Sequence, residues 1–375
     1  MQKLCVFPND PIIAYYKKGE IKTRYYNPTN FFDEVHIISL IEKDINESKV
    51  QNLSGNAKLK IHSVGKINIK NCYKHTKRII ELIRSINPAV IRAYNPLVEG
   101  WLAASSAKEL KIPFFLSLHT QYDQKRKIAK KNNLKKFLVL KYTEKFIEPF
   151  VLNTANHITI VHKIIEPYVL KHGGKKPEVL YNKIDYERFS NGIPIKSLPQ
   201  PLIISVGNLI KEKNHQCLIE AMMNVNAHLL IIGNGKLYQS LQNLILHNKL
   251  EEKIVIIKSV PNNEIQNFYK SAQVFALAYD PELEGLPIPV MEAMATGLSV
   301  VIPYPKIKYS DGLEDEVIFS KRDPISFAQN ITKVLNDTKL QAKLSLEAQK
   351  KAKDFDNIVI EKHEAQIYSK LVEKL

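Results

Sequence analysis

The sequence predicts an α/β protein made of two Rossmann-like domains whose parallel sheets face each other across a cleft. A chain of 375 residues with 45% hydrophobic content is too long for one ordinary core and suits two domains of about 150 to 200 residues. In both halves, nearly continuous apolar runs of strand length alternate with segments of helical periodicity. This alternation is typical of a parallel sheet with helices on both faces.

The order of the predicted elements is the same in each half. In the first half, a strand, a helix and a strand are predicted at 88–94, 98–110 and 112–119. In the second half, strands are predicted at 202–207, 228–233, 254–260 and 274–279, and helices around 217–223 and at 236–247, 264–272 and 289–296. We therefore expect domains at 1–189 and 202–375, with the last helix packing back on the first domain. Residues 190–201 are rich in Pro, Ser and Gly and lack periodicity, so we expect them to form a linker.

Several classes of protein are disfavoured by composition. The N-terminal residues run directly into a strand-like segment without the pattern of a secretory signal, and no apolar run reaches the ~18 residues of a membrane span. Cys5, Cys72 and Cys217 are isolated and are not spaced like metal ligands, so they are expected to be buried, reduced thiols. We expect a soluble, cytoplasmic protein.

Positive charge is concentrated in one segment of the first half. The net charge is +16, and residues 125–141 contain eight Lys or Arg and no acid. Such a segment is compatible with a nucleic acid, an anionic membrane or an anionic substrate, or simply with a solvated helix face. Aromatic residues are not interleaved with these lysines as in a base-stacking surface, so nucleic acid is disfavoured.

Candidate binding groups follow the predicted strands. Open parallel sheets bind ligands outside the carboxyl ends of their strands. In the second domain this rule selects the segments 207–208, 233–235 and 259–261 and the loop after Tyr279; in the first domain it selects 92–95 and 119–121.

The segment YDPELEGLPIPVMEAMATG, residues 279–297, contains two carboxylates near the start of a predicted helix. Pro289 suits the first helical turn and Gly297 the end of the helix. Glu284 before the helix and Glu292 within it are able to grip hydroxyls on two sugar rings that flank a diphosphate, because a carboxylate accepts several hydrogen bonds. Gly285 would let the backbone approach such a ligand. Alternatively, Glu292 merely complements the helix dipole and Glu284 is solvated.

Several motifs resemble one family. EGLPIPVMEAMATGLSVV resembles the Glu-x7-Glu signature of the family-4 retaining glycosyltransferases, which have the GT-B fold. SVGNLIKEKNHQCLIEA, LLIIGNGKL and VPNNEIQNFYKSAQVFALAY resemble further motifs of that family in the same order, and SLHTQYD, NHITIVHKII and LYNKIDYERF do so in the first domain. The resemblance implies a hexosyltransferase that moves a sugar from a nucleotide-sugar donor, with UDP-sugar favoured, to a glycan or lipid-linked acceptor with retention of configuration.

The resemblance also implies site residues. Glu284 matches the acid tied to catalysis, and His119 matches a histidine near the reacting sugar. Glu292 matches the acid that holds the ribose hydroxyls, and Lys213 matches the lysine that neutralises the donor phosphates. The remaining implied donor-binding positions, which include the backbone contact to the nucleobase and the loop that reaches the phosphates, are Gly207, Asn208, Gly233, Val260, Gly285, Leu286 and Pro287.

The sequence departs from the family in three places. Asn208 stands where the family usually has an Arg, so one phosphate-binding cation is missing. The usual Gly-Gly loop after the first strand is absent, and the lone Gly19 beside Lys18 is the expected substitute on the acceptor and diphosphate side. Ser299 replaces a frequent Pro. No Asp-x-Asp motif or metal-ligand cluster is evident, so we expect a metal-independent transfer that needs no cofactor.

Residues 125–146 alternate Lys clusters with Leu, Phe and Val, as an interfacial helix does. Members of this family that associate with membranes use a basic part of the first domain, so we expect peripheral binding to the inner face of an anionic membrane.

Four other interpretations of the function stay open. They are a GT-B sugar-nucleotide epimerase, a phosphorylase, a noncatalytic sugar-binding relative and, from charge alone, a nucleic-acid-binding protein.

Overall fold

The computed structural model describes residues 2–305 and 309–373, and the chain divides into two compact units. Unit 1 comprises Met1–Tyr181 and Glu361–Leu375, and unit 2 comprises Asn182–Ile360. The division therefore falls eight residues before the predicted domain end at residue 189. The physical reason is that α8 (Tyr186–Ser190) packs on α11 and α13 of unit 2.

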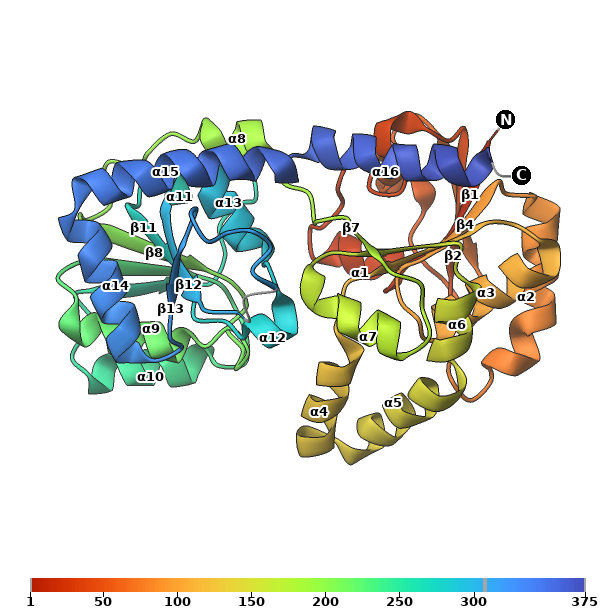
Figure 1. The fold of residues 1–375 in the computed structure, drawn as a ribbon, viewed down its shortest axis with the longest axis horizontal. Coiled ribbons are helices and arrows are strands. Elements are labelled where there is room, and N and C mark those ends of the chain that lie inside the picture. The colour runs from red at the N-terminus through yellow and green to blue at the C-terminus, as the bar shows by residue number, and fades with distance from the viewer. Residues whose placement is uncertain (1, 306–308, 374–375) are drawn as a thin grey trace. The chain divides into compact units, whose positions relative to one another are not determined.

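Unit 1 is built around one parallel sheet, with the strand order β3-β2-β1-β4-β5-β6-β7 in the described residues (Figure 1). Its strands are β1 (Lys3–Phe7), β2 (Glu34–Ser39), β3 (Lys58–Ser63), β4 (Val90–Ala93), β5 (Phe114–Leu118), β6 (His157–Ile160) and β7 (Glu178–Val179). Its helices are α1 (Ile12–Lys17), α2 (Cys72–Ile86), α3 (Val98–Leu110), α4 (Tyr122–Asn132), α5 (Leu134–Phe146), α6 (Glu148–Thr154) and α7 (Glu166–Lys171). Every residue of β4 and β5 is buried, as expected for central strands covered on both faces.

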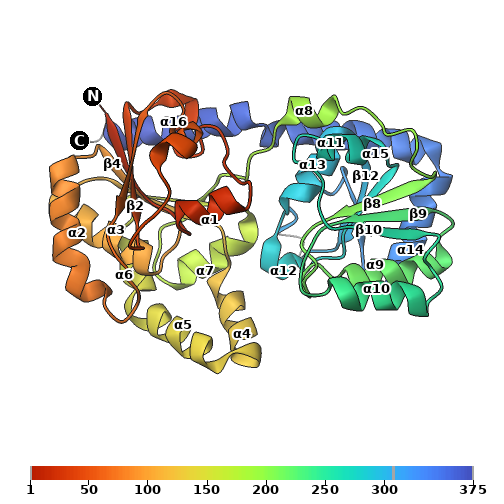
Figure 2. The ribbon, with the colours of Figure 1, turned by 180° about the vertical axis from the view of Figure 1, so that it is seen from behind.

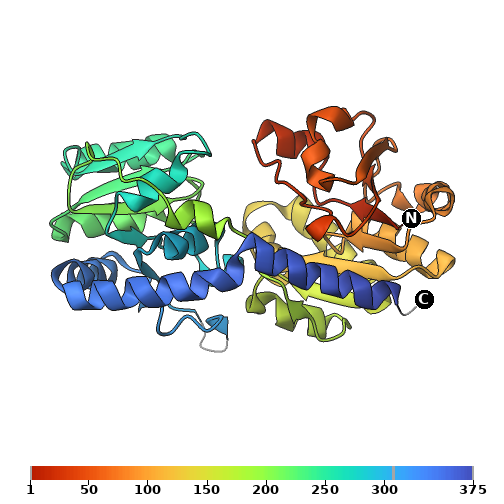
Figure 3. The same cartoon turned by 90° about the horizontal axis from the view of Figure 1, so that it is seen from above.

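The last helix, α16 (Asn357–Val372), contributes its residues from Glu361 onward to unit 1 (Figure 3). Tyr368 lies in the same apolar cluster as Leu4 and Val6 of β1. Glu361 accepts a hydrogen bond from Arg24 at 2.8 Å, and Glu364 pairs with the buried Arg92 of β4. Apolar contact and charge pairing together hold this end of the helix on unit 1.

Unit 2 contains a second parallel sheet, with the order β10-β9-β8-β11-β12-β13 in the described residues. Its strands are β8 (Leu202–Val206), β9 (His228–Ile232), β10 (Ile254–Ile257), β11 (Val274–Ala276), β12 (Ser299–Pro303) and β13 (Ile318–Ser320). Besides α8 and the first residues of α16, its helices are α9 (His215–Ala221), α10 (Tyr238–His247), α11 (Ile265–Lys270), α12 (Pro281–Glu284), α13 (Ile288–Thr296), α14 (Pro324–Asn336) and α15 (Thr338–Ala352). The predicted pair of parallel-sheet, Rossmann-like domains is confirmed, whereas their arrangement across a cleft stays a prediction.

Helices cover both faces of the unit 2 sheet (Figure 2). On one face, α9, α10 and α14 bury a continuous apolar cluster that includes Ile203, Ile231 and Phe327. On the other face, α11 and α13 pack on each other and on α8. The segment 190–201, expected to be a linker, lies against α11, where the amide of Ile195 donates to Ser271 Oγ at 2.7 Å.

Candidate active site

The carboxyl ends of the unit 2 strands bring the predicted donor-side residues to one edge of the sheet. Gly207 and Gly233 directly follow β8 and β9, and Val260 lies in the loop after β10. Glu284 ends α12, which follows β11. The loop after β11 is tied to the loop after β8, because the amide of Asp280 donates to the carbonyl of Glu212 at 2.9 Å. Parallel strands end at the same edge, so residues far apart in sequence become neighbours there.

Two glycines allow these loops to pack backbone against backbone. A Cβ on Gly233 would lie 1.9 Å from the carbonyl oxygen of Gly207, and a Cβ on Gly235 would lie 2.5 Å from that of Leu209. Side chains do not fit at such distances, so both positions require glycine. The glycine turn predicted from LLIIGNGKL therefore shapes the edge of the sheet directly.

Lys213 and Glu284 form an ion pair between Nζ and Oε2, although they are 71 residues apart in sequence. Lys213 is 8% exposed, and the Glu284 side chain is 27% exposed. The methylenes of Lys213 lie beside Gly207, where a Cβ would be 3.5 Å from Cδ. The lysine predicted to neutralise phosphates and the acid predicted to be catalytic are thus in direct contact.

The turn between α12 and α13 depends on glycine. The side chain of Asp280 caps α12 by accepting the amide of Glu282 at 3.1 Å. Gly285 then adopts φ 61° and ψ −113°, a conformation that L side chains rarely adopt. Leu286, 3% exposed, anchors the turn in the core, and Pro287 precedes the first helical residue of α13.

The helix α13 begins at Ile288, one residue before the predicted start, and ends at Thr296; Gly297, with φ 85°, caps its C-terminus. Glu292 lies in its second turn and accepts a hydrogen bond from the hydroxyl of Tyr269 at 2.9 Å. Tyr269 lies on α11 and was not among the predicted site residues. The sequence gives no sign of this contact, because Tyr269 and Glu292 lie on different helices and are 23 positions apart.

On unit 1, His119 follows β5 and its ring lies 5.6 Å from that of Tyr94. Burial lowers the pKa of His119 to about 3, and the nearby charge of Arg92 acts in the same direction. His119 is therefore neutral near pH 7. Arg92, in the segment expected at the strand ends, lies within the core instead, with its guanidinium carbon 4.4 Å from the Tyr94 ring centre.

The predicted acceptor-side residues Gly19 and Lys18 do not lie in the loop between β1 and α1. They follow the last residue of α1, where Gly19 has φ 69°. At the first turn of α1, the amides of Ile12 and Ile13 donate to the carboxylate of Asp44 at 2.9 and 2.7 Å. Their role on the acceptor and diphosphate side stays a prediction.

Asn208, the residue in place of the expected Arg, lies exposed in the loop after β8. Lys211, three residues further along the same loop, is also exposed. Position 208 therefore supplies no charge, and Lys211, the nearby lysine in the same loop, is exposed to solvent.

The basic segment 125–146 forms two helices, α4 and α5, separated at Asn133, rather than one interfacial helix. Asn133 follows the last residue of α4 and caps α5 by accepting the amide of Lys136 at 2.9 Å. One of its basic residues is not on the surface. Arg126 is 4% exposed and donates to both carboxylate oxygens of Glu148 at 2.9 Å.

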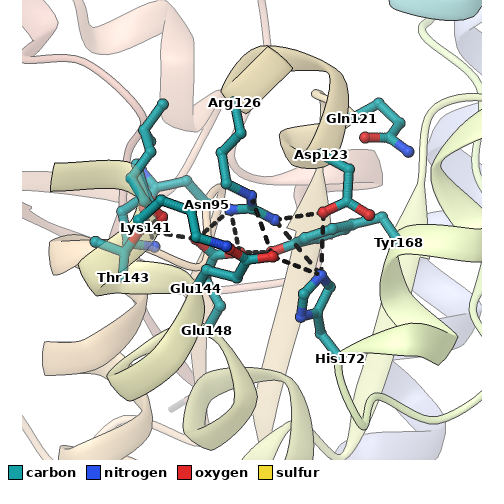
Figure 4. Close-up of polar contacts among 12 residues, drawn as sticks. Asn95, Gln121, Asp123, Arg126, Lys141, Thr143, Glu144, Glu148, Tyr168 and His172 are labelled. Carbon is teal, nitrogen blue, oxygen red and sulfur yellow. Dashed lines mark hydrogen bonds and ion pairs between the residues drawn. The ribbon is translucent and has the colours of Figure 1, made fainter. Parts of the chain in front are cut away.

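Figure 4 shows acidic and polar side chains from α4 to α7 converging on Arg126. Arg126 Nη2 donates to Asp123 at 2.7 Å, and Tyr168 donates to Glu148 at 2.6 Å. Burial alone would raise the pKa of Asp123, but hydrogen bonds from His172, Arg126 and Lys171 outweigh it and lower the pKa below its ordinary value.

The ligand atoms of Asp123, Glu144 and His172 lie within 4.8 Å of one another, a spacing that would suit a metal ion. Arg126 and Lys141 already supply positive charge to these carboxylates. The cluster therefore fits a charge-balanced ion-pair network, and metal independence of the reaction stays a prediction.

Residues 188–351 match the model of the family described as glycosyl transferases group 1. The matched segment covers less than half of the chain and lies within unit 2. It includes Lys213, Glu284 and Glu292, so the contacts described above lie within the matched residues. The match supports the predicted resemblance to glycosyltransferases over this segment.

Two curated relatives extend the similarity. The chain is 30% identical over 192 residues to the N-acetylgalactosamine-N,N'-diacetylbacillosaminyl-diphospho-undecaprenol 4-alpha-N-acetylgalactosaminyltransferase of Campylobacter jejuni, covering 50% of this chain and 52% of that protein. It is 25% identical over 333 residues to the alpha-monoglucosyldiacylglycerol synthase of Acholeplasma laidlawii, covering 80% and 79%. The match therefore spans about half the length of the first relative and most of the second.

Solved structures support the fold over the whole chain. A glycosyltransferase from Rickettsia africae covers 100% of this chain and 99% of its own, with a TM-score of 0.74 at 16% identity. Anabaena HepE in complex with UDP covers 99% and 100%, with a TM-score of 0.75 at 14% identity. The chain therefore has the GT-B fold, as predicted.

Proposed function

We propose that the protein moves a hexose-type sugar from a UDP-sugar to a lipid-linked or glycan acceptor, with retention of anomeric configuration and without a metal ion. The observation that carries this proposal is the contact between Lys213 and Glu284 beside the Gly285 turn. A sugar diphosphate needs a cation for its phosphates, an acid for its sugar and a glycine turn that lets the backbone come close. All three lie at one edge of the unit 2 sheet.

The relatives support the choice of substrates. The Campylobacter jejuni relative is named for a diphospho-undecaprenol substrate, and the Acholeplasma laidlawii relative for a glucosylated diacylglycerol. Anabaena HepE has been solved with UDP. We extend these properties to this chain as a nucleotide-sugar donor with uridine and an acceptor that carries a lipid.

The chemistry follows from the charge that develops during transfer. Breaking the anomeric bond leaves a nucleoside diphosphate, whose growing negative charge is stabilised by preorganised cations and N–H donors. In the proposal Lys213 supplies the cation, Glu292 holds the ribose, and Glu284 faces the sugar. His119, being neutral, serves as a hydrogen-bonding group for the sugar or the acceptor hydroxyl rather than as a charged acid.

We also propose that α4 and α5 bind an anionic membrane surface from the cytoplasmic side. Leu134, Leu138 and Tyr142 recur every fourth residue on α5, so they share a face, and they are 65%, 59% and 40% exposed. Exposed Lys135 and Lys145 flank this face. Apolar side chains among lysines suit the boundary between lipid headgroups and acyl chains. Among the described residues, no helix has the length and apolar character needed to cross a membrane.

An acceptor-dependence assay tests the transfer. The protein is incubated with UDP-hexoses, with and without a lipid extract, and the release of UDP is measured. We expect release of UDP that depends on the acceptor and is lost in Glu284→Gln but kept in Lys339→Gln, an exposed lysine of α15. Interconversion of the donor sugar without UDP release would instead favour an epimerase. Consumption of inorganic phosphate would favour a phosphorylase.

Liposome flotation tests the membrane surface. We expect binding to vesicles that contain anionic lipid and loss of binding in Leu138→Ser and in Lys135→Gln. Leu246→Ser on α10, a side chain of similar exposure at 56%, is the matched control. Equal flotation with neutral and anionic vesicles would contradict the proposed binding of α4 and α5 to an anionic membrane.

A further inference from the structure

Tyr269 holds the carboxylate of Glu292 from outside the helix that carries it. The phenol donates to Glu292 Oε2 at 2.9 Å and lies 3.4 Å from the carbonyl oxygen of Pro289. Tyr269 belongs to α11 and Glu292 to α13. The contact therefore fixes an acid of one helix by means of a neighbouring helix.

The ring of Tyr269 is itself immobilised. Its side chain is fully buried, stacks on Phe275 with ring centres 6.0 Å apart, and meets Phe189 edge to face at 5.6 Å. The adjacent Lys270 donates to the carbonyl of Thr296 at 3.2 Å, so α11 holds α13 at its end as well as at Glu292. A donor in such a setting has little freedom to follow a moving carboxylate.

The phenol can act only as a donor toward Glu292. Burial, and to a lesser degree the charge of Glu292, raise the pKa of Tyr269 well above its ordinary value, so its hydroxyl keeps the proton. The phenol therefore sets the orientation of the Glu292 carboxylate through one of its oxygens, Oε2.

From this geometry we infer that Tyr269 is a positioning residue that aims Glu292 at the ribose hydroxyls of the donor nucleotide. The inference rests on the proposed function, because it takes a ribonucleoside diphosphate as the ligand of unit 2. It adds a specific consequence, namely that selectivity for ribose over a sugar without hydroxyls depends on a side chain that does not touch the nucleotide.

The experiment compares two ligands in matched variants. Dissociation constants for UDP and for 2′,3′-dideoxyuridine diphosphate are measured by calorimetry with the full chain, and their ratio reports the contribution of the ribose hydroxyls. Tyr269→Phe keeps the packed ring and removes only the donor. Tyr238→Phe on α10, whose hydroxyl accepts from Gln242 at 3.4 Å, removes a hydroxyl elsewhere in unit 2.

We expect Tyr269→Phe to reduce the dideoxy-to-ribose ratio by about three- to tenfold, because a hydrogen bond to a charged group is involved. Glu292→Gln should reduce the ratio further, and Tyr269→Phe in that background should add little.

The outcomes separate the two proposals. If the wild-type protein binds neither ligand, the proposed function fails. If the wild-type protein discriminates between the ligands and Tyr269→Phe discriminates equally well, the role of Tyr269 is wrong while the function stands. If Tyr269→Phe weakens the binding of both ligands by the same factor, the phenol supports the fold of the site rather than the orientation of Glu292. The inference is then also overturned.

Discussion

Replacing Lys213 with Gln tests whether the donor diphosphate rests on this side chain. Lys213 is 8% exposed, so solvent screens its charge only weakly. A hydrogen bond to a charged group contributes about 1.5 to 3 kcal/mol, which corresponds to an increase in Kd of roughly 10- to 150-fold. Because Glu284 pairs with the same ammonium, we expect the lower part of that range, about 10- to 30-fold for UDP.

Calorimetric titration with UDP measures the effect, and Lys339→Gln is the control for loss of one surface charge. Glu284→Gln should leave the affinity for UDP unchanged or tighten it, because Lys213 is then released to the phosphates. A Kd for Lys213→Gln within twofold of wild type would refute the reasoning. So would a loss in Glu284→Gln as large as that in Lys213→Gln, since the pair would then act as a single structural support.

Three further effects are expected. Burial lowers the pKa of His119 from 6.5 to about 3, so as the pH falls the unfolded chain binds a proton there before the folded chain does. The free energy of unfolding therefore decreases as the pH falls below about 6.5. His119→Gln should reduce this acid sensitivity in denaturation midpoints measured between about pH 4 and 7. Gly233→Ala places a Cβ against backbone and should destabilise unit 2 by about 3 kcal/mol in urea unfolding. Arg126→Gln removes the cation that pairs with the fully buried Glu148 and should cost about 3 to 5 kcal/mol, whereas the exposed Lys127→Gln should stay within about 0.5 kcal/mol, as judged from urea midpoints.

The parts of the structure set by local periodicity were predictable. The helix predicted at 98–110 has the same bounds as α3, and the helix predicted at 289–296 differs from α13 by one residue. The rule that ligands bind at the carboxyl ends of parallel strands correctly assigned Gly207, Gly233 and the loop that carries Glu284 to one edge of the sheet. Pattern and topology suffice where each element is determined by its own residues.

The parts set by long-range pairing were not predictable. Arg126 stands in a run of basic residues that looks uniformly exposed, yet its partner Glu148 lies 22 positions away on another helix. The same applies to Arg92 of β4, whose partner Glu364 is 272 positions away. Whether a charged side chain is buried depends on a partner that supplies the opposite charge, and sequence spacing does not reveal that partner.

The ion pair at the sheet edge offers a reason for placing an acid next to a lysine that is proposed to bind phosphate. An unpaired charge at such low exposure is costly, so Lys213 and Glu284 stabilise each other. If a sugar diphosphate binds as proposed, its phosphates carry more negative charge than one carboxylate and take over the lysine. Glu284 is then released at the moment when the donor sugar arrives beside it. Binding of the diphosphate and availability of the acid are thereby linked, which explains why the two groups belong to one pair rather than to separate pockets.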